Sequence, residues 1–213
     1  MTILLNAVEA RVLGALVEKE ITTPEYYPLS LNALVNACNQ KNNREPVMNL
    51  DEDAVRQALR GLEDDGLAGP RRGGDSRVTK YEHHLQEVFN FTRGETAIMC
   101  VLLLRGPQTP GEVRGRTERM HRFEEIEDVL GTLQKLMQRE PPLVKPLARQ
   151  PGTKETRYGH LLSGEVETAE AAPVASAAES ANGDDRVTRL EAEVAELRQE
   201  VAELRDRVER LIS

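Results

Sequence analysis

The chain has 213 residues with 3% aromatic side chains and no tryptophan, so its cores must be small and built on aliphatic side chains. Of the formal net charge of −8, a charge of −7 falls in residues 164–213, which hold 13 acids and 6 bases. The remaining body is near neutral, which excludes a protein held on nucleic acid or on an anionic membrane by its overall charge.

The cysteines and the first residues predict the cellular compartment. Cys38 and Cys100 stand in no metal-ligand spacing, which is typical of reduced, packed thiols. No apolar run reaches the length of a membrane span, and Ile3-Leu4-Leu5 is too short for a signal peptide. We therefore expect a cytoplasmic protein that does not enter a membrane.

Two helices are predicted in residues 6–38. Asn6 and Glu9 form a capping-box pattern before an apolar helix face that ends near Glu20. Thr23-Pro24 restarts the chain, because proline is favoured at a first helical position. Residues 31–38 then carry apolar side chains at helical spacing.

A polar loop, a third helix and a basic hairpin follow. The loop, residues 39–46, is too rich in asparagine and too close to Pro46 to be helical. Asp51 is the expected N-cap of the third helix, and Gly66 stands where its C-cap is expected. The inward stripe of this helix consists of Val55, Ala58, Leu59 and Leu62. The turn Gly73-Gly74-Asp75 between two short extended runs predicts a hairpin.

The same succession recurs from Thr92 onward, which predicts a divergent tandem repeat. Thr92 and Glu95 form a second capping-box pattern, and a hairpin is predicted around Pro151-Gly152. The second stripe consists of Ile126, Val129, Leu130 and Leu133. We expect third helices over residues 51–65 and 124–139; the alternative is chance similarity between two amphipathic segments.

The two copies can be overlaid piecewise. Thr23-Pro24 aligns with Thr109-Pro110 at an offset of 86 residues, and Val55 aligns with Ile126 at an offset of 71. The overlay therefore predicts 15 more residues between the second and third helices of the first copy (86 against 71), around the loop 39–46.

The end of the chain predicts a linker and a coiled coil. Residues 164–185 are rich in alanine, glutamate and serine, which is typical of a disordered linker. In residues 186–213 valine occupies every a position and leucine every d position of four heptads, the preference of a parallel two-stranded coiled coil. These residues are Val187, Leu190, Val194, Leu197, Val201, Leu204, Val208 and Leu211. We predict a homodimer through this segment; the alternatives are pairing with another protein and a helix folded back on its own domain.

Several runs of the sequence, taken together, resemble the YceH-like family of bacterial proteins. They are Thr23-Pro24-Glu25-Tyr26-Tyr27-Pro28-Leu29-Ser30, Ala37-Cys38-Asn39-Gln40-Lys41, Asn43-Arg44-Glu45-Pro46-Val47-Met48-Asn49-Leu50, Arg77-Val78-Thr79-Lys80-Tyr81, Leu102-Leu103-Leu104-Arg105-Gly106 and Gln108-Thr109-Pro110-Gly111-Glu112. The resemblance spans roughly residues 6–164. It implies two winged-helix domains in tandem and brings no catalytic residues, because the family has no assigned function.

The predicted fold class is mainly α with small β-hairpins. We expect two winged-helix (helix-turn-helix) domains in tandem, residues 1–90 and 91–163, followed by the linker 164–185 and the coiled-coil helix 186–213.

The sequence offers no pattern for catalysis or for a cofactor. His83 and His84 are adjacent, so their rings cannot face one side of a strand, and His121 and His160 stand alone. No phosphate-binding loop and no nucleophile elbow occurs. We therefore expect a protein that is not an enzyme and needs neither a metal nor another cofactor.

The candidate binding residues lie on the loop and on the two hairpins rather than on the third helices. The N-terminal parts of the third helices carry Asp51-Glu52-Asp53 and Glu124-Glu125, whose charge opposes DNA phosphates. The expected nucleic-acid or partner-binding residues are Gln40, Lys41, Asn42, Asn43, Arg44, Arg71, Arg72, Arg77, Lys80, Lys154 and Arg157. The alternative for each basic hairpin is a solvated edge whose charges discourage aggregation.

Two functions from different classes follow. The first is a dimeric DNA-binding regulator that uses the hairpins and the loop. The second is a protein-interaction scaffold, as in the tandem winged-helix subunits of chromosome-organising complexes, which the acidic net charge favours. We prefer the first, and the sequence leaves open whether DNA or protein is the ligand.

Overall fold

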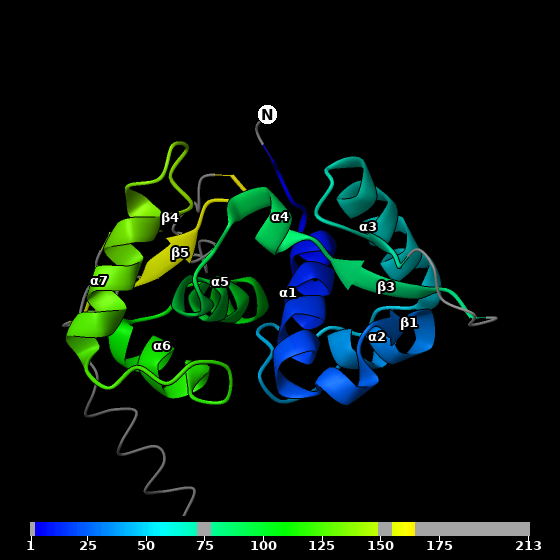
Figure 1. Cartoon of the computed structure of the whole chain (residues 1–213), viewed down its shortest axis with the longest axis horizontal. Helices are drawn as coiled ribbons and strands as arrows, with labels where there is room; N and C mark the ends of the chain where they lie inside the picture. Colours follow the sequence, from blue (N-terminus) through cyan, green and yellow to red (C-terminus); the bar gives the residue numbers. More distant parts are fainter. Residues whose placement is uncertain (1–2, 72–77, 149–154, 165–213) are drawn as a thin grey trace, which may run out of the picture. The chain divides into compact units, whose positions relative to one another are not determined.

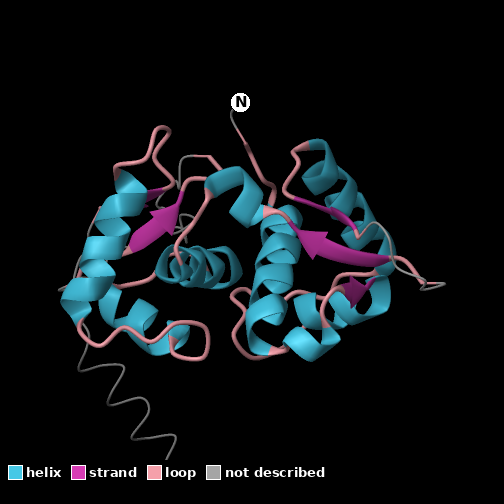
Figure 2. Ribbon diagram, viewed as in Figure 1, coloured by secondary structure: helices cyan, strands magenta, loops and turns pink. Residues whose placement is uncertain are grey.

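A computed structural model describes residues 3–71, 78–148 and 155–164 (Figure 1). In this part of the chain seven α-helices accompany two small antiparallel sheets (Figure 2). In chain order the elements are α1 (Ala7–Thr22), η1 (Pro24–Tyr26), β1 (Leu29–Ser30), α2 (Leu31–Cys38), α3 (Glu52–Asp64), β2 (Ala68–Pro70), β3 (Lys80–His83), α4 (Leu85–Phe89), α5 (Arg93–Arg105), α6 (Pro110–Thr117), α7 (Ile126–Met137), β4 (Val144–Pro146) and β5 (Tyr158–His160). None of these helices combines the length and hydropathy of a membrane span.

Local capping fixes where the long helices begin. At the start of α1 the Asn6 side chain accepts hydrogen bonds from Val8 N and Glu9 N, and the Glu9 carboxylate accepts from Asn6 N. Thr92 and Glu95 make the same reciprocal pair before α5. The two capping boxes and the Asp51 cap of α3 confirm the predicted starts of these helices. Such caps can be predicted from sequence because each joins residues only three apart.

Each sheet contains one predicted hairpin. In the first sheet β3 is the central strand, and Ala68 of β2 pairs with His83 while Leu29 of β1 pairs with Tyr81. In the second sheet β4 pairs with β5, with Val144 opposite His160. The turns of both hairpins, residues 72–77 and 149–154, lie outside the described residues.

The order helix, short strand, helix, helix, hairpin occurs twice, from α1 to β3 and again from α5 to β5. We call these two runs of elements the first half and the second half. In the first half the short strand is β1; in the second half it is a single bridge between Gln108 and Tyr158. The following helix is capped at once in both cases, by Ser30, the last residue of β1, before α2 and by Thr109, directly after the bridge residue Gln108, before α6. The repetition of elements therefore extends to their pairing and capping.

This correspondence corrects the predicted overlay. Ser30 and Thr109 are 79 residues apart, whereas Thr23-Pro24 precedes the short η1 turn and not the second helix. The buried residues of α3 and α7 are 74 apart, as in Val55 and Val129. The first half thus has 5 more residues between these points (79 against 74) rather than 15.

The predicted inward stripe of the second third helix was also wrong in part. Ile126 and Leu130 are 40% and 39% exposed, whereas Val129, Leu133 and Leu136 are buried. The inward face of α7 follows a spacing of four and three from Val129, so the helix is rotated relative to the prediction.

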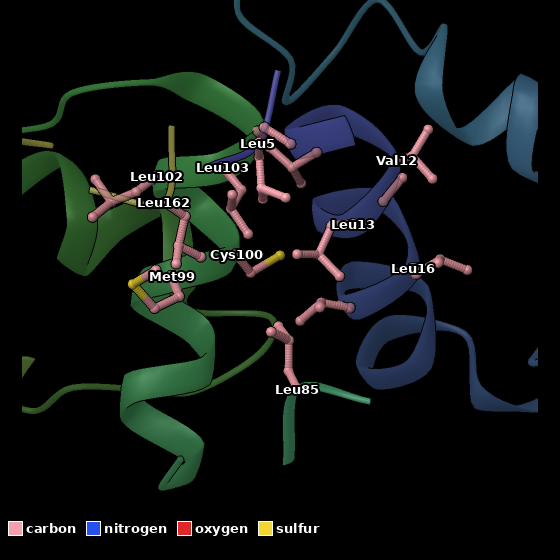
Figure 3. Close-up of a cluster of buried hydrophobic side chains, with 14 of the residues drawn as sticks. Leu5, Val12, Leu13, Leu16, Leu85, Met99, Cys100, Leu102, Leu103 and Leu162 are labelled. Carbon is pink, nitrogen blue, oxygen red and sulfur yellow. The ribbon is translucent and has the colours of Figure 1, made fainter. Parts of the chain in front are cut away.

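The two halves share one hydrophobic core, in which α1 packs against α5. Figure 3 shows Leu13 of α1 and Cys100 of α5 between these helices. The approach is close at Gly14, where a Cβ atom would lie 2.9 Å from Leu104, and the Cys100 Sγ lies 3.5 Å from the Gly14 carbonyl oxygen. Glycine allows the two backbones to come this near.

A second connection joins the start of the chain to the end of the second half. Leu5 N donates a 2.6 Å hydrogen bond to Leu162 O, and both residues are buried. The division into domains 1–90 and 91–163 stays a prediction. The predicted coiled coil, and the linker beyond Gly164, lie outside the described residues.

Candidate functional site

The predicted hairpin residues that the structure describes are exposed and partly paired. The Arg71 side chain is 56% exposed, with Nη1 3.6 Å from a Glu82 carboxylate oxygen, and Lys80 is exposed on β3. Arg157 lies on the second hairpin, with Nη2 3.6 Å from a Glu112 carboxylate oxygen. Arg72, Arg77 and Lys154 lie outside the described residues.

Arg44 lies inside the protein rather than on the loop surface. Its side chain is fully buried and donates to both carboxylate oxygens of Glu18, at 2.6 and 3.1 Å. It also donates to the carbonyl oxygens of Ala37 and Asn43 and to the amide oxygen of Gln40. Arg44 therefore positions the loop 39–46, and its expected contact with a base edge has no exposed guanidinium to make it.

Two further side chains, those of Arg11 and Asn39, form hydrogen bonds that hold the same loop in place. Arg11 is 1% exposed and donates to the carbonyl oxygens of Cys38, at 3.2 Å, and Pro46, at 2.6 Å. The Asn39 side chain pairs with the backbone of Leu50 through two 2.8 Å hydrogen bonds. These hydrogen bonds between buried or half-buried side chains and the loop backbone favour one loop conformation, although the Nε of Arg11 has no partner among the described residues.

The loop also contacts the second half of the chain. Glu45 N donates a 2.9 Å hydrogen bond to Leu104 O at the end of α5. The guanidinium of Arg105 donates to the side-chain oxygen of Asn43. Asn43 itself has a φ of 60°, a left-handed conformation that asparagine tolerates better than most residues. The exposed tip of the loop is thus fixed against α5.

These contacts create a basic hollow between α1, the loop and α6. A cavity of about 330 Å³ is lined by Glu18, Lys19, Thr22, Gln40, Lys41, Asn42, Asn43 and Arg119. A smaller cavity shares four of these residues and adds Arg105 and Arg116, among others. We call the two together the basic hollow. Its lining has five bases and one carboxylate, Glu18, which already pairs with Arg44.

Burial and neighbouring charges both act on Arg105 in the basic hollow. The pKa of Arg105 is lowered by partial burial and by the positive charges of Arg116 and Arg44, although Glu45 opposes the shift. One carboxylate oxygen of Glu112 lies 3.4 Å from Arg116 and 3.6 Å from Arg157. Arg157 of the second hairpin is therefore linked to the hollow through Glu112.

The structure brings some predicted residues together and adds others. Gln40, Lys41, Asn42 and Asn43, four of the expected binding residues, all line the basic hollow. Arg105, Arg116 and Arg119 were not predicted. The signal for them is the group of arginines between residues 105 and 122, which lies outside the predicted loop and hairpins.

A separate, larger cavity than the two of the basic hollow lies at the junction of the two halves. This junction pocket has a volume of about 530 Å³ and was not predicted. It is lined by Glu20, Ile21, His83, Leu85, Gln86, Phe91, Arg93, Thr96 and Met120. His83 is 8% exposed, and its Nε2 lies 2.8 Å from a Glu20 carboxylate oxygen.

Other chemical features can be placed within the described ranges. No group of three or more His, Cys, Asp and Glu side chains there could hold a metal ion. Cys38 and Cys100 are buried free thiols, and burial raises the pKa of Cys38 to about 12. The acids at the starts of α3 and α7, including Glu52, Asp53 and Glu127, are exposed.

Comparison with known proteins identifies relatives along most of the chain. Residues 5–153 match the family described as "Protein of unknown function, DUF480". A UPF0502 protein of Koribacter versatilis is 60% identical over 198 residues, 92% of this chain and 91% of the relative. A UPF0502 protein of Vibrio campbellii is 51% identical over 218 residues and 100% of both chains. The predicted YceH-like resemblance is confirmed, because that family is the same one.

Proposed function

Because the chain belongs to the DUF480 family, whose description assigns no activity, we propose from the geometry that it is a non-catalytic, dimeric DNA-binding protein of the cytoplasm. The observation that carries this proposal is the basic hollow, in which five bases and three side-chain amides converge. Arginine and lysine neutralise phosphates, and amide groups of asparagine and glutamine pair with base edges.

The order of elements supports two winged-helix units as the scaffold. In each half three helices precede a hairpin, and a short strand before the second helix pairs with the hairpin. Many winged helices place the third helix in the major groove. Here the exposed acids at the starts of α3 and α7 would face phosphates with the wrong sign. DNA therefore contacts the basic hollow, with the basic hairpins as flanking contacts.

The hollow suits a phosphate backbone because its walls are already fixed. Arg44, Arg11 and Asn39 hold the loop, and Arg105 joins Asn43 to α5. Lys41, Asn42, Asn43 and Arg119 remain exposed. These four side chains can meet a strand without rearrangement of the backbone.

The test compares two double variants that change the net charge equally. Lys41→Ala with Arg119→Ala removes two phosphate contacts, which should weaken binding and flatten the slope of log K against log salt by about 1.8. Arg56→Ala with Arg60→Ala removes two exposed bases of α3 outside the hollow and should leave binding and slope nearly unchanged. Fluorescence anisotropy with labelled duplex at several salt concentrations measures both.

Two results would end the proposal. Full-length protein that binds duplex no more tightly than about 100 μM at low salt would lie at the weak edge of non-specific affinity. Equal losses for the two double variants would show that only the overall charge matters. The hairpin contribution is tested in the same assay by Arg71→Ala with Arg72→Ala, which should also flatten the slope if the first hairpin contacts phosphates.

The dimer in this proposal rests on the heptads of residues 186–213. Val194→Asp with Val201→Asp would bury like charges at the seam, which is too costly to tolerate. Light scattering should then report a monomer. Far-UV circular dichroism of the same variant should show that the helices of the body are retained. A double variant that is still dimeric would refute the coiled-coil assignment.

A protein-interaction scaffold is the second candidate, and one observation favours it. Ile126 and Leu130 are exposed one turn apart on α7, beside Glu127. An apolar pair flanked by acids suits a partner with a basic, apolar segment. Pull-downs from cell extract distinguish the candidates, because a scaffold retains its partners after nuclease treatment and loses them in Ile126→Ser with Leu130→Ser.

A further inference from the structure

The junction pocket is formed by four separate segments. The last turn of α1 contributes Glu20 and Ile21, and the segment from β3 to α4 contributes His83, Leu85 and Gln86. The first turn of α5 and Met120, which follows α6, form the other side. Figure 1 shows the chain running from β3 through α4 to α5. The volume of the junction pocket, about 530 Å³, falls in the range of pockets for metabolite-sized ligands, about 300–1,000 Å³.

One end of the pocket carries an ionised carboxylate in a fixed position. The hydrogen bond from His83 is the largest cause that lowers the pKa of Glu20, while partial burial opposes it. His83 Nδ1 accepts a hydrogen bond from Leu85 N at 3.3 Å, so the ring proton must lie on Nε2 and point to Glu20. In this arrangement His83 holds one carboxylate oxygen of Glu20, and the lowered pKa keeps that carboxylate ionised at neutral pH.

Four apolar side chains line the rest of the pocket, beside the polar side chains of Gln86, Arg93 and Thr96. Ile21, Leu85, Phe91 and Met120 line it, and Leu85 and Phe91 are 1% and 4% exposed. The second carboxylate oxygen of Glu20 accepts no hydrogen bond from the described residues, and the Glu20 side chain is 46% exposed. A carboxylate with a free oxygen beside an apolar wall is complementary to a cation that carries an apolar body.

We propose that the junction pocket binds a metabolite-sized molecule with a protonated amine attached to an apolar group. The ammonium contacts the free oxygen of Glu20, His83 holds that carboxylate in place, and the apolar group lies against Leu85, Phe91 and Met120. This site shares Met120 with the smaller cavity of the basic hollow, but Glu20 and His83 line only the junction pocket, and the assignment does not depend on the nucleic-acid proposal.

Arg93 is the charge in the pocket lining that opposes this assignment. It is exposed at the start of α5 and makes no ion pair with the described residues. An anionic ligand would seek Arg93, whereas the carboxylate of Glu20 is the charge that a buried neighbour fixes in position. The two ligand classes therefore respond in opposite ways to the same variants, and a direct comparison decides between them.

The methionine methyl groups provide a local reporter in the full-length protein. The chain has five methionines, and Met120 is the one that lines the junction pocket. With ¹³C-labelled methionine methyls, n-hexylamine at neutral pH should shift the Met120 signal in a saturable way. Hexanoate and hexan-1-ol carry the same apolar chain and should bind at least tenfold more weakly. The variant Met120→Leu assigns the signal.

Charge variants test the role of each group. Glu20→Gln keeps the shape of the side chain and should weaken n-hexylamine binding at least tenfold, while the exposed control Glu25→Gln should not change it. Arg93→Ala removes a like charge and should strengthen amine binding. The signals of Met99, which is buried, and Met137, which packs against the core, report whether each variant keeps its fold.

The proposal is overturned if hexanoate shifts Met120 at lower concentrations than n-hexylamine does. It is also overturned if all three probes bind alike, or if none shifts Met120 by 10 mM. These comparisons use the unmodified protein, so they decide the question even if a variant fails to fold.

Discussion

Replacement of Arg44 by alanine should destabilise the protein strongly, although the residue belongs to a loop. The substitution removes the partner of Glu18, whose side chain is only 12% exposed, and hydrogen bonds to Ala37 O and Asn43 O. Breaking a buried ion pair from one side costs about 3–5 kcal/mol. Because Glu18 keeps some access to water, we expect about 3 kcal/mol, near the lower end of that range.

Urea unfolding followed by far-UV circular dichroism measures this loss, since the chain has no tryptophan for fluorescence. With a denaturant slope of about 2–3 kcal/mol/M, the midpoint should fall by about 1–1.5 M. The control is Arg56→Ala, which breaks the exposed pair with Glu52 on α3 and should cost no more than about 0.5 kcal/mol.

A double-mutant cycle separates the ion pair from the loss of packing. Once Glu18→Ala has removed the carboxylate, Arg44→Ala should cost at least about 1 kcal/mol less than it does alone. A loss below about 1 kcal/mol for Arg44→Ala in the unmodified background would contradict the inference that this residue fixes the loop.

Three further predictions concern the core and its titration. Gly14→Val should destabilise the protein by about 1–3 kcal/mol in urea unfolding, because its side chain would clash with Leu103 and Leu104 of α5; an unchanged midpoint would show that α1 and α5 can separate freely. Burial raises the pKa of Cys38 to about 12 and that of Cys100 further, so neither thiol should react with a disulfide reagent at pH 8 until denaturant is added. Burial lowers the pKa of His160 to about 4. Between pH 6.5 and 5 the unfolded chain therefore binds a proton at this residue that the folded chain does not bind. The free energy of unfolding should fall as pH falls through this range, by at most about 1.4 kcal/mol per pH unit. His160→Gln should remove that part of the pH dependence, and an identical slope in the variant would assign it elsewhere.

The predictable part of the fold is the part that depends on nearby residues. The capping boxes at Asn6 and Thr92 join residues three apart, and the hairpin strands flank short glycine-containing turns, so both could be predicted from the sequence. The short strand β1 was missed because it has two residues and gains its identity from pairing with Tyr81, about fifty residues later. The rotation of α7 was not predicted because Ile126, Val129, Leu130 and Leu133 also fall at helical spacing, and spacing alone does not show which side of an apolar helix is buried. The overlay was wrong because Thr23-Pro24 and Thr109-Pro110 precede different elements.

The candidate site shows the same division. Lys41, Asn42 and Asn43 were predicted because a polar loop is visible locally. Arg105 and Arg119 join them only through the packing of α5 and α6 against the loop. Arg44 could not be separated from its exposed neighbours, because burial of a charge depends on a partner, Glu18, 26 residues earlier. Sequence spacing does not report such a contact.

The close approach at Gly14 has an entropic consequence for binding. Two domains on a flexible tether must be ordered when one ligand contacts both, and part of the binding energy is lost in that step. Here the backbone of α1 lies directly against α5, so Lys41 on one wall of the hollow and Arg119 on the other are held by one core. The walls are preorganised, and a bound strand has only its own freedom and that of the contacting side chains to lose.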